Sequence, residues 1–323
     1  MRLFLYHFIF MMLFSVGVTA QEVSLNIGHV LDLRHPLHLG GVRMAEVAAQ
    51  RSNGRIKVNI FPSSQLGSDR EMLQNTQAGV IGGMLEATTK LVTFVPQFGV
   101  LDLPYLATSR AQAFRLLDSS VIEQELNTRA AAAGFQIIGY WEVTLRSVYT
   151  RTKVINSVAD LRGLKIRVIP SPSFITLFRA LGASPTPMSF GELYTALQQG
   201  VVDGAENDIL TYQGVKHAEV AKNLAITNHM MLINAFIVSE KHWAKIPDDL
   251  KSVLRTASVE GRKAVNDTRE AREKTAIAEL KSAGVRVTEP DLKPFVDTGR
   301  STYKEFEQRL GRELIDKVVA AAK

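Results

Sequence analysis

The chain has 323 residues, of which 46% are hydrophobic and 22% charged, which suits two domains of about 100 to 200 residues with a substantial core. It contains no cysteine, which excludes disulfides, zinc ribbons, thiol nucleophiles and a lipid-modified N-terminal cysteine. Its net charge of +6 is scattered, without a basic run, so nucleic acid is not an expected partner, whereas an anion-attracting cleft is compatible with it.

Residues 1–20 have the pattern of a secretory signal peptide. Arg2 precedes a long apolar run, and the small residues VTA at 18–20 suit cleavage after Ala20. A membrane anchor is the alternative, but the apolar run is short for a span and is interrupted by small and polar residues. Loss of this segment, which contains Arg2 and no acidic residue, changes the net charge from +6 to +5. We therefore expect a mature protein that diffuses freely in a periplasm.

Strand and helix patterns alternate along the rest of the chain. Alternating β-branched residues predict strands, and amphipathic spacing closed by glycine predicts helices. This order is typical of an α/β fold with parallel strands. We expect strands at 23–27, 55–61, 80–87, 135–141, 163–169 and 201–204, an extended segment at 184–187, and helices at 37–52, from Asp69, over 110–133, at 173–181 and at 191–199.

Two later segments are expected to connect the domains. Two apolar runs between residues 223 and 238 flank Asn228 and His229 and resemble two buried strands that lead back to the first domain. Residues 248–283 predict one helix of about 50 Å, at about 1.5 Å per residue, which would run across both domains. Two helices with a kink near Gly261 are the alternative.

The pattern places a domain boundary near residues 142–146. The expected domain I comprises residues 21–144 plus about 233–272, and domain II comprises residues 145–232 plus about 273–323, with the ligand cleft between them.

The segment GLKIRVIPSP, residues 163–172, places Arg167 near the end of a strand that prolines terminate. Ligands of open α/β sheets bind outside the carboxyl ends of the strands. Arg167 is therefore either an anion clamp or a solvated edge residue. Its planar guanidinium matches a carboxylate better than the point charge of Lys165.

A second informative segment, LGASPTPMSFGELYTALQQGVVDGAEND, covers residues 181–208. Glu206 and Asn207 follow a predicted buried strand end. The amide of Asn207 can donate two hydrogen bonds and accept two, which suits a carboxylate or a sugar hydroxyl. The alternative is that Asn207 caps the following helix.

These segments, with KHAEVAKNLAITNH, SSQLGSDREML and VLDLPYL, resemble the DctP-type solute receptors of tripartite ATP-independent periplasmic (TRAP) transporters. The resemblance covers essentially the whole mature chain. It implies a two-domain periplasmic binding protein-like α/β fold with a long domain-spanning helix, which closes on an organic acid. It also implies a membrane partner, the TRAP permease subunits. A monomer is expected, with no cofactor.

The resemblance also implies roles for individual residues. Arg167 would form a bidentate salt bridge with the ligand carboxylate, assisted by Arg146, with Asn207 and Glu206 nearby and Phe190 packed over the ligand. An interdomain structural ion pair is the alternative for Arg146, and ordinary core packing is the alternative for Phe190.

Further candidates have equally good structural interpretations. Asp69 lies where the family has an acidic residue near the cleft, but it could instead be a helix N-cap. Glu86 could accept from sugar hydroxyls or be a solvated loop residue, and Tyr212 could face the cleft or pack in the core. His29 and His35 remain open as first-domain contacts. The HxxH spacing of His35 and His38 is weak evidence for a metal, and no metal site is expected.

The ligand class follows from the polar residues and from the resemblance. LRSVYTRTK with GAEND resembles the branch of the family that takes uronates and aldonates, and C4-dicarboxylates are the alternative. A dicarboxylate would need a second cationic cluster, whereas Asp69, Glu86 and Glu206 favour hydroxyls. Enzymatic motifs such as GxSxG, HExxH, a P-loop or GxGxxG are absent, so an enzyme is not expected. A sensory module with the same fold remains a third possibility, which neighbouring permease genes would exclude.

Overall fold

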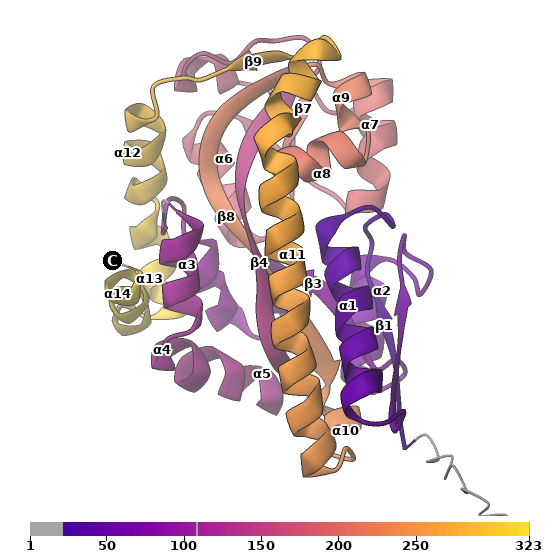
Figure 1. The fold of residues 1–323 in the computed structure, drawn as a ribbon. Helices are drawn as coiled ribbons and strands as arrows, with labels where there is room; N and C mark the ends of the chain where they lie inside the picture. The colour runs from indigo at the N-terminus through magenta and orange to yellow at the C-terminus, as the bar shows by residue number, and fades with distance from the viewer. Residues whose placement is uncertain (1–21, 108, 323) are drawn as a thin grey trace, which may run out of the picture.

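The computed structural model describes residues 22–107 and 109–322; the expected signal peptide lies outside this part of the chain. Within it, one mixed sheet of nine strands runs through the molecule in the order β2-β1-β3-β8-β4-β7-β5-β6, with β9 paired to β8. Helices cover the sheet (Figure 1). This confirms the expected α/β class. No described helix combines the length and apolar character needed to cross a membrane.

The first half of the sheet consists of three strands that follow the predicted alternation. β1 and β2 pair in parallel, as do β1 and β3. The apolar residues of β1 are buried and alternate with exposed polar residues, and β3 is buried throughout. The elements are β1 (Val23–Gly28), α1 (Pro36–Arg51), β2 (Ile56–Phe61), α2 (Asp69–Ala78), β3 (Gly83–Ala87) and the 3-10 turns Thr88–Thr93 and Pro96–Asp102.

The second half repeats the strand–helix order. β5 pairs in parallel with β6 and with β7. Residues 201–203 form a bend, so the strand predicted at 201–204 begins later, at Gly204. The elements are β5 (Lys165–Val168), α6 (Pro172–Ala180), β6 (Ser184–Pro187), α7 (Leu193–Gln199), β7 (Gly204–Asn207), α8 (Ile209–Gly214), α9 (His217–Val220) and two 3-10 turns, Val158–Leu161 and Phe190–Glu192.

Two long antiparallel strands, β4 (Phe135–Thr150) and β8 (Asn223–Ser239), join the halves. β8 also pairs with β3, and β4 also pairs with β7. The prediction of two separate strands within 223–238 was wrong, because both apolar runs pair with β4. The irregular middle is a bulge: the register shifts between Arg146 and Val148, and Asn228 has a φ of 45°.

Helix α11 (Asp248–Ser282) is continuous, so the prediction of one long helix is confirmed and the kink near Gly261 is not. In Figure 1 it runs beside α1 toward one end of the molecule and beside α8 toward the other. Gly261 is instead a packing residue: a Cβ there would lie 2.8 Å from the Trp141 ring and 3.0 Å from the Gly40 carbonyl oxygen. The glycine lets α1 and α11 approach each other closely.

The remaining helices cover parts of both halves. The predicted helical stretch 110–133 is broken into short pieces, and α13 and α14 pack into the core that includes Phe98, Leu116 and Ile122. α12 packs against α6, and Phe295 is buried there. The elements are α3 (Arg110–Leu117), α4 (Ser120–Ile122), a π-helical turn (Glu123–Asn127), α5 (Thr128–Ala132), α10 (Glu240–Trp243), β9 (Arg286–Thr288), α12 (Lys293–Ser301), α13 (Tyr303–Leu310) and α14 (Arg312–Ala321).

Candidate functional site

A cavity lies between the two halves, outside the carboxyl ends of β3, β5 and β7, where α/β sheets bind ligands. Each half and both crossing strands contribute polar side chains to it. From the first half come His35, Glu86 and Lys90; from the second, Arg167, Asn207, Asp208 and Thr211, together with the aromatic ring of Phe190; from the crossing strands, Arg146 and Asn234.

Arg167 is a buried cation whose hydrogen bonding is incomplete. It is 2% exposed, and its Nε and Nη2 both donate to the carbonyl oxygen of Met188, at 3.0 and 2.7 Å. Its Nη1 has no hydrogen-bond partner, and no described carboxylate lies within ion-pairing distance of it. Burial lowers the pKa of Arg167, but a guanidinium stays protonated in proteins. The cavity therefore contains a positive charge without a protein counter-ion.

Arg146 also lines the cavity, but Glu206 neutralises it. Its Nε donates to Glu206 Oε2, and its Nη2 donates to Glu206 Oε1 at 2.9 Å and to the Glu206 carbonyl oxygen at 2.8 Å. Burial would lower the pKa of Arg146 and raise that of Glu206, but their attraction reverses both shifts. Glu206 is 0% exposed and does not line the cavity. Arg146 thus has a structural ion pair, but its partner Glu206 lies in the same expected domain II, so this is not the interdomain pair considered above.

Asn207 and Phe190 flank Arg167. Asn207 Oδ1 accepts from Arg146 Nη1 at 2.7 Å and from the Asp208 amide at 2.9 Å, whereas its Nδ2 has no hydrogen-bond partner among the described residues. Asp208, not Asn207, caps α8, so the capping interpretation of Asn207 was wrong. The Phe190 ring is half-buried, and its centroid lies 5.8 Å from Arg167 Cζ. Asn207 can therefore donate to a ligand, and Phe190 covers the guanidinium.

Asp69, Glu86 and Lys90 form an ionic group that we call the Lys90 cluster. Lys90 Nζ lies 2.6 Å from Asp69 Oδ2 and 2.9 Å from Glu86 Oε1. Glu86 is 5% exposed, its Oε2 has no partner, and burial raises its pKa while Lys90 opposes the rise. Asp69 lines an adjoining cavity with Lys90 and Phe94, and Ser68 is the N-cap of α2. The N-cap interpretation of Asp69 and the solvated-loop interpretation of Glu86 were therefore wrong.

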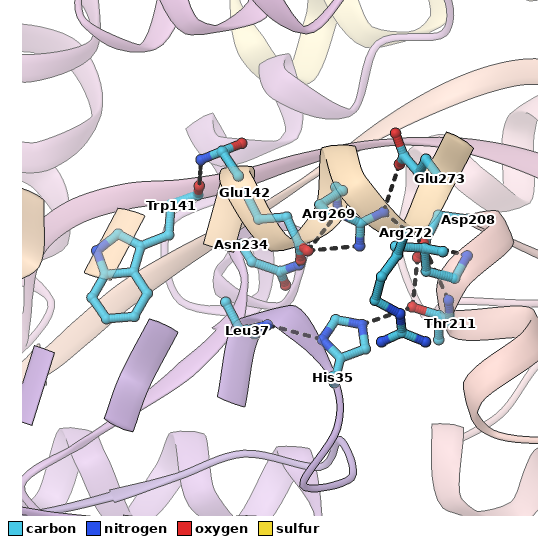
Figure 2. A network of polar contacts seen from close by, with 12 residues as sticks. His35, Leu37, Trp141, Glu142, Asp208, Thr211, Asn234, Arg269, Arg272 and Glu273 are labelled. Carbon is cyan, nitrogen blue, oxygen red and sulfur yellow. Dashed lines mark hydrogen bonds and ion pairs between the residues drawn. The ribbon is translucent and has the colours of Figure 1, made fainter. Parts of the chain in front are cut away.

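A polar network connects the cavity to α11 (Figure 2). His35 Nδ1 accepts from the Leu37 amide at 3.1 Å, which leaves the ring proton on Nε2, 3.2 Å from Thr211 Oγ1. Thr211 in turn donates to Asp208 Oδ2 at 2.6 Å. Burial lowers the pKa of His35, so the ring is neutral. This chain of hydrogen bonds joins the two halves across the cavity.

Arg269 anchors the network on α11. Figure 2 shows its guanidinium between Glu142 and Asp208. Its Nε donates to Glu142 Oε1 at 2.7 Å, and its Nη1 donates to Asp208 Oδ1 at 3.0 Å. Asn234 Nδ2 donates to Glu142 Oε2 at 2.6 Å. Arg269 therefore has carboxylate counter-ions, although its Nη2, 2.6 Å from Glu142 Oε1, has no hydrogen-bond partner. It ties the helix to the crossing strands and to the second half.

The remaining candidates lie away from the cavity. Tyr212 is buried among apolar residues, and its hydroxyl donates to the Ala221 carbonyl at 2.6 Å, which is the core packing considered above. His29 Nε2 lies 3.0 Å from His38 Nδ1, and neither lines the cavity.

Sequence reasoning missed four polar residues that line the cavity. They are Lys90, Asp208, Thr211 and Asn234. The four-residue spacing of Glu86 and Lys90 was not a usable signal, because that spacing brings side chains together on a helix and Glu86 lies in a strand.

Residues 27–309 match the family described as "Bacterial extracellular solute-binding protein, family 7", or DctP. The chain belongs to the DctP family. Its members are solute receptors of TRAP transporters, not enzymes; they are periplasmic, bind small organic acids and work with TRAP permeases. The expected receptor class is confirmed, and the enzymatic alternative is excluded.

The similarity to individual DctP-type proteins extends over the full length. The sialic acid-binding periplasmic protein SiaP of Vibrio cholerae is 33% identical over 312 residues, which cover 95% of this chain and 97% of SiaP. The C4-dicarboxylate-binding periplasmic protein DctP of Rhodobacter capsulatus is 29% identical, with 95% and 93% covered. The sugar acid-binding protein DctPAm of Advenella mimigardefordensis, solved with galactonate, has a TM-score of 0.89 and 27% identity, with 93% and 97% covered.

Proposed function

We propose that this DctP-type protein captures a hydroxylated monocarboxylate, a uronate or an aldonate, and delivers it to a TRAP permease. The observation that carries the proposal is the buried, unpaired guanidinium of Arg167 in the cavity. A buried charge without a partner is unfavourable, and a ligand carboxylate would supply the missing counter-ion. Arg146 and Arg269 have protein carboxylates, so Arg167 is the described arginine that needs a ligand.

The energies are of the right order for a transported solute. A charge-assisted hydrogen bond contributes about 1.5 to 3 kcal/mol, and micromolar affinity needs about 8 kcal/mol. Contacts of the carboxylate with Arg167 Nη1 and Asn207 Nδ2 would therefore supply about half of the binding free energy. Hydroxyl contacts and closure of the cavity would supply the rest.

Hydroxyl groups are favoured where Glu86 lines the cavity. Glu86 Oε2 is a buried acceptor without a donor, and a ligand hydroxyl would satisfy it. The galactonate complex of DctPAm supports this ligand class. A C4-dicarboxylate, as the name of the Rhodobacter capsulatus relative indicates for that protein, would need a second free cation. Lys90 does not provide one, because Asp69 and Glu86 already share its charge.

Capture involves closure of two domains in this proposal. β4, β8 and α11 cross between the halves, so bending within them would open and close the cavity. Domain I would contain residues 21–144 plus about 233–272, and domain II residues 145–232 plus the chain from about 273. The packing of α13 and α14 supports assigning these two helices to domain I instead. Cleavage of the signal peptide near Ala20 and a monomeric state belong to the same proposal.

Calorimetry on Arg167 variants tests the proposal, after a thermal-shift panel of uronates, aldonates and C4-dicarboxylates has identified a ligand. Arg167→Ala should weaken binding at least about tenfold, and Arg167→Lys should not restore it, because the guanidinium fork is lost. Arg179→Ala, an exposed arginine of the same half, is the matched control and should bind like the wild type. Stabilisation by succinate or malate alone would contradict the sugar-acid class, and unchanged affinity in both Arg167 variants would contradict the carboxylate anchor.

A further inference from the structure

The Lys90 cluster contains one more carboxylate than it has cations. Lys90 Nζ contacts Asp69 Oδ2 at 2.6 Å and Glu86 Oε1 at 2.9 Å, so one ammonium group serves two acids. The Lys90 side chain is only 16% exposed, and those of Asp69 and Glu86 are 10% and 6% exposed. Solvent therefore screens the excess negative charge poorly.

The excess charge faces the ligand cavity. Glu86 and Lys90 both line it, and Glu86 Oε2 is buried without a hydrogen-bond partner. The backbone amide of Ala87 and Lys90 both contact the other oxygen, Oε1. A ligand atom at this wall thus meets an uncommitted carboxylate oxygen, which accepts from a hydroxyl and repels an anion.

No other cation of the described cavity lining is available to offset this charge. Arg146 is paired with Glu206, and His35 is neutral because its Nδ1 accepts from the Leu37 amide. Arg167 is free, but the proposed function assigns it to the first carboxylate of the ligand. A second carboxylate would have to lie beside Glu86 with no counter-ion.

We propose that the Lys90 cluster is a charge filter, which admits hydroxylated monocarboxylates and rejects acids that carry a second carboxylate at the end remote from Arg167. Two carboxylates that share a buried site cannot both stay ionised, so a diacid binds only if one of the pair takes up a proton. A terminal hydroxyl at the same place instead donates to Glu86 Oε2. This inference rests on the proposed function and adds the residues that separate mono- from dicarboxylates.

An aldonate and the aldarate of the same carbon skeleton form a matched pair of probes. Gluconate and glucarate differ only in whether the terminal carbon is a hydroxymethyl or a carboxylate. Calorimetry should show that the wild type binds the aldonate at least about tenfold more tightly than the aldarate. Glu86→Gln and Asp69→Asn each remove the excess charge. Each should reduce the ratio of aldonate to aldarate affinity at least about fivefold by strengthening aldarate binding.

The two variants distinguish charge from hydrogen bonding. Asp69 lines the adjoining cavity rather than the main one, so Asp69→Asn changes the charge of the cluster and leaves Glu86 in place. If Glu86→Gln does not fold, Asp69→Asn alone tests the charge filter. Glu46→Gln removes an equal charge from the exposed face of α1 and should keep the wild-type ratio. Equal wild-type affinity for both acids, or an unchanged affinity ratio in both variants, would overturn the charge filter and leave the proposed function intact. Failure of the wild type to bind any hydroxylated acid or diacid would overturn the filter together with the proposed function.

Discussion

Asp102 should make the stability of this receptor fall as the pH rises, because its carboxyl group is buried between the two halves. Its Oδ2 accepts from Thr89 in the first half and, at 3.1 Å, from Ser171 at the start of α6 in the second half. Burial raises the pKa of Asp102 from 3.8 to about 7, and these two hydrogen bonds offset only part of the rise. The folded protein therefore holds a proton that the unfolded chain releases at much lower pH.

The size and sign of the effect follow from this shift. A raised folded-state pKa gives stability that is present at acid pH and is lost as the pH rises through about 7. One pKa unit corresponds to about 1.4 kcal/mol, so the free energy of unfolding should lose on the order of 3 kcal/mol between about pH 5 and about pH 8. Buried neutral histidines such as His35 and His229 act in the opposite direction, because burial lowers their pKa values. The contribution of Asp102 must therefore be measured as the difference between the wild type and a variant that lacks this carboxyl group.

Urea denaturation of the wild type and Asp102→Asn at both pH values gives that difference. The asparagine does not titrate, so the wild type should lose about 3 kcal/mol relative to the variant over this interval. Asp316→Asn, at an exposed position of α14, is the control and should follow the wild type. Parallel pH profiles of the wild type and Asp102→Asn would refute the assignment of a buried, protonated carboxyl group to Asp102.

Two further substitutions test packing and pairing in the same denaturation assay. Glu206→Gln should lower the free energy of unfolding by about 3 to 5 kcal/mol, because it leaves the buried Arg146 without a counter-ion. Gly261→Ala should lower it by about 1 to 3 kcal/mol, because the added Cβ would lie 2.8 Å from the Trp141 ring and separate α11 from α1.

Each of these substitutions has a control in the chain. Glu46→Gln removes a carboxylate that is exposed on α1, and Gly191→Ala adds a Cβ where no atom lies within 4 Å. Both controls should stay within about 0.5 kcal/mol of the wild type. A loss below about 1 kcal/mol in Glu206→Gln would show that Arg146 does not depend on this pair, and a Gly261→Ala variant as stable as Gly191→Ala would show that the helix crossing tolerates a side chain.

Local patterns predicted several of the elements and the position of Arg167. The alternating strand at 163–169, closed by prolines, determines that Arg167 lies at a carboxyl strand end, where the cavity is found. The periodicity of 248–283 likewise predicted α11, which is a single helix. Local patterns failed at β8, because its two apolar runs become one strand only through pairing with β4.

The pairing state of the charged residues could not be predicted from local sequence. Arg146 and Glu206 are 60 residues apart, and only the β4–β7 register brings them together. This pairing neutralises Arg146 and keeps Glu206 out of the cavity lining. Arg146 and Arg167 were both candidate carboxylate ligands in the sequence, but only Arg167 lacks a protein carboxylate in the described part of the fold. Asp69 and Glu86 share one lysine for the same reason, since α2, β3 and the following 3-10 turn converge on Lys90.

A crystal structure of the protein with a bound aldonate or uronate tests the central claim most directly. The ligand carboxylate should lie within hydrogen-bonding distance of Arg167 Nη1, the atom that has no partner in the described residues, with a ligand hydroxyl on Glu86 Oε2. A carboxylate bound elsewhere, with Arg167 Nη1 still unpaired, would contradict the account.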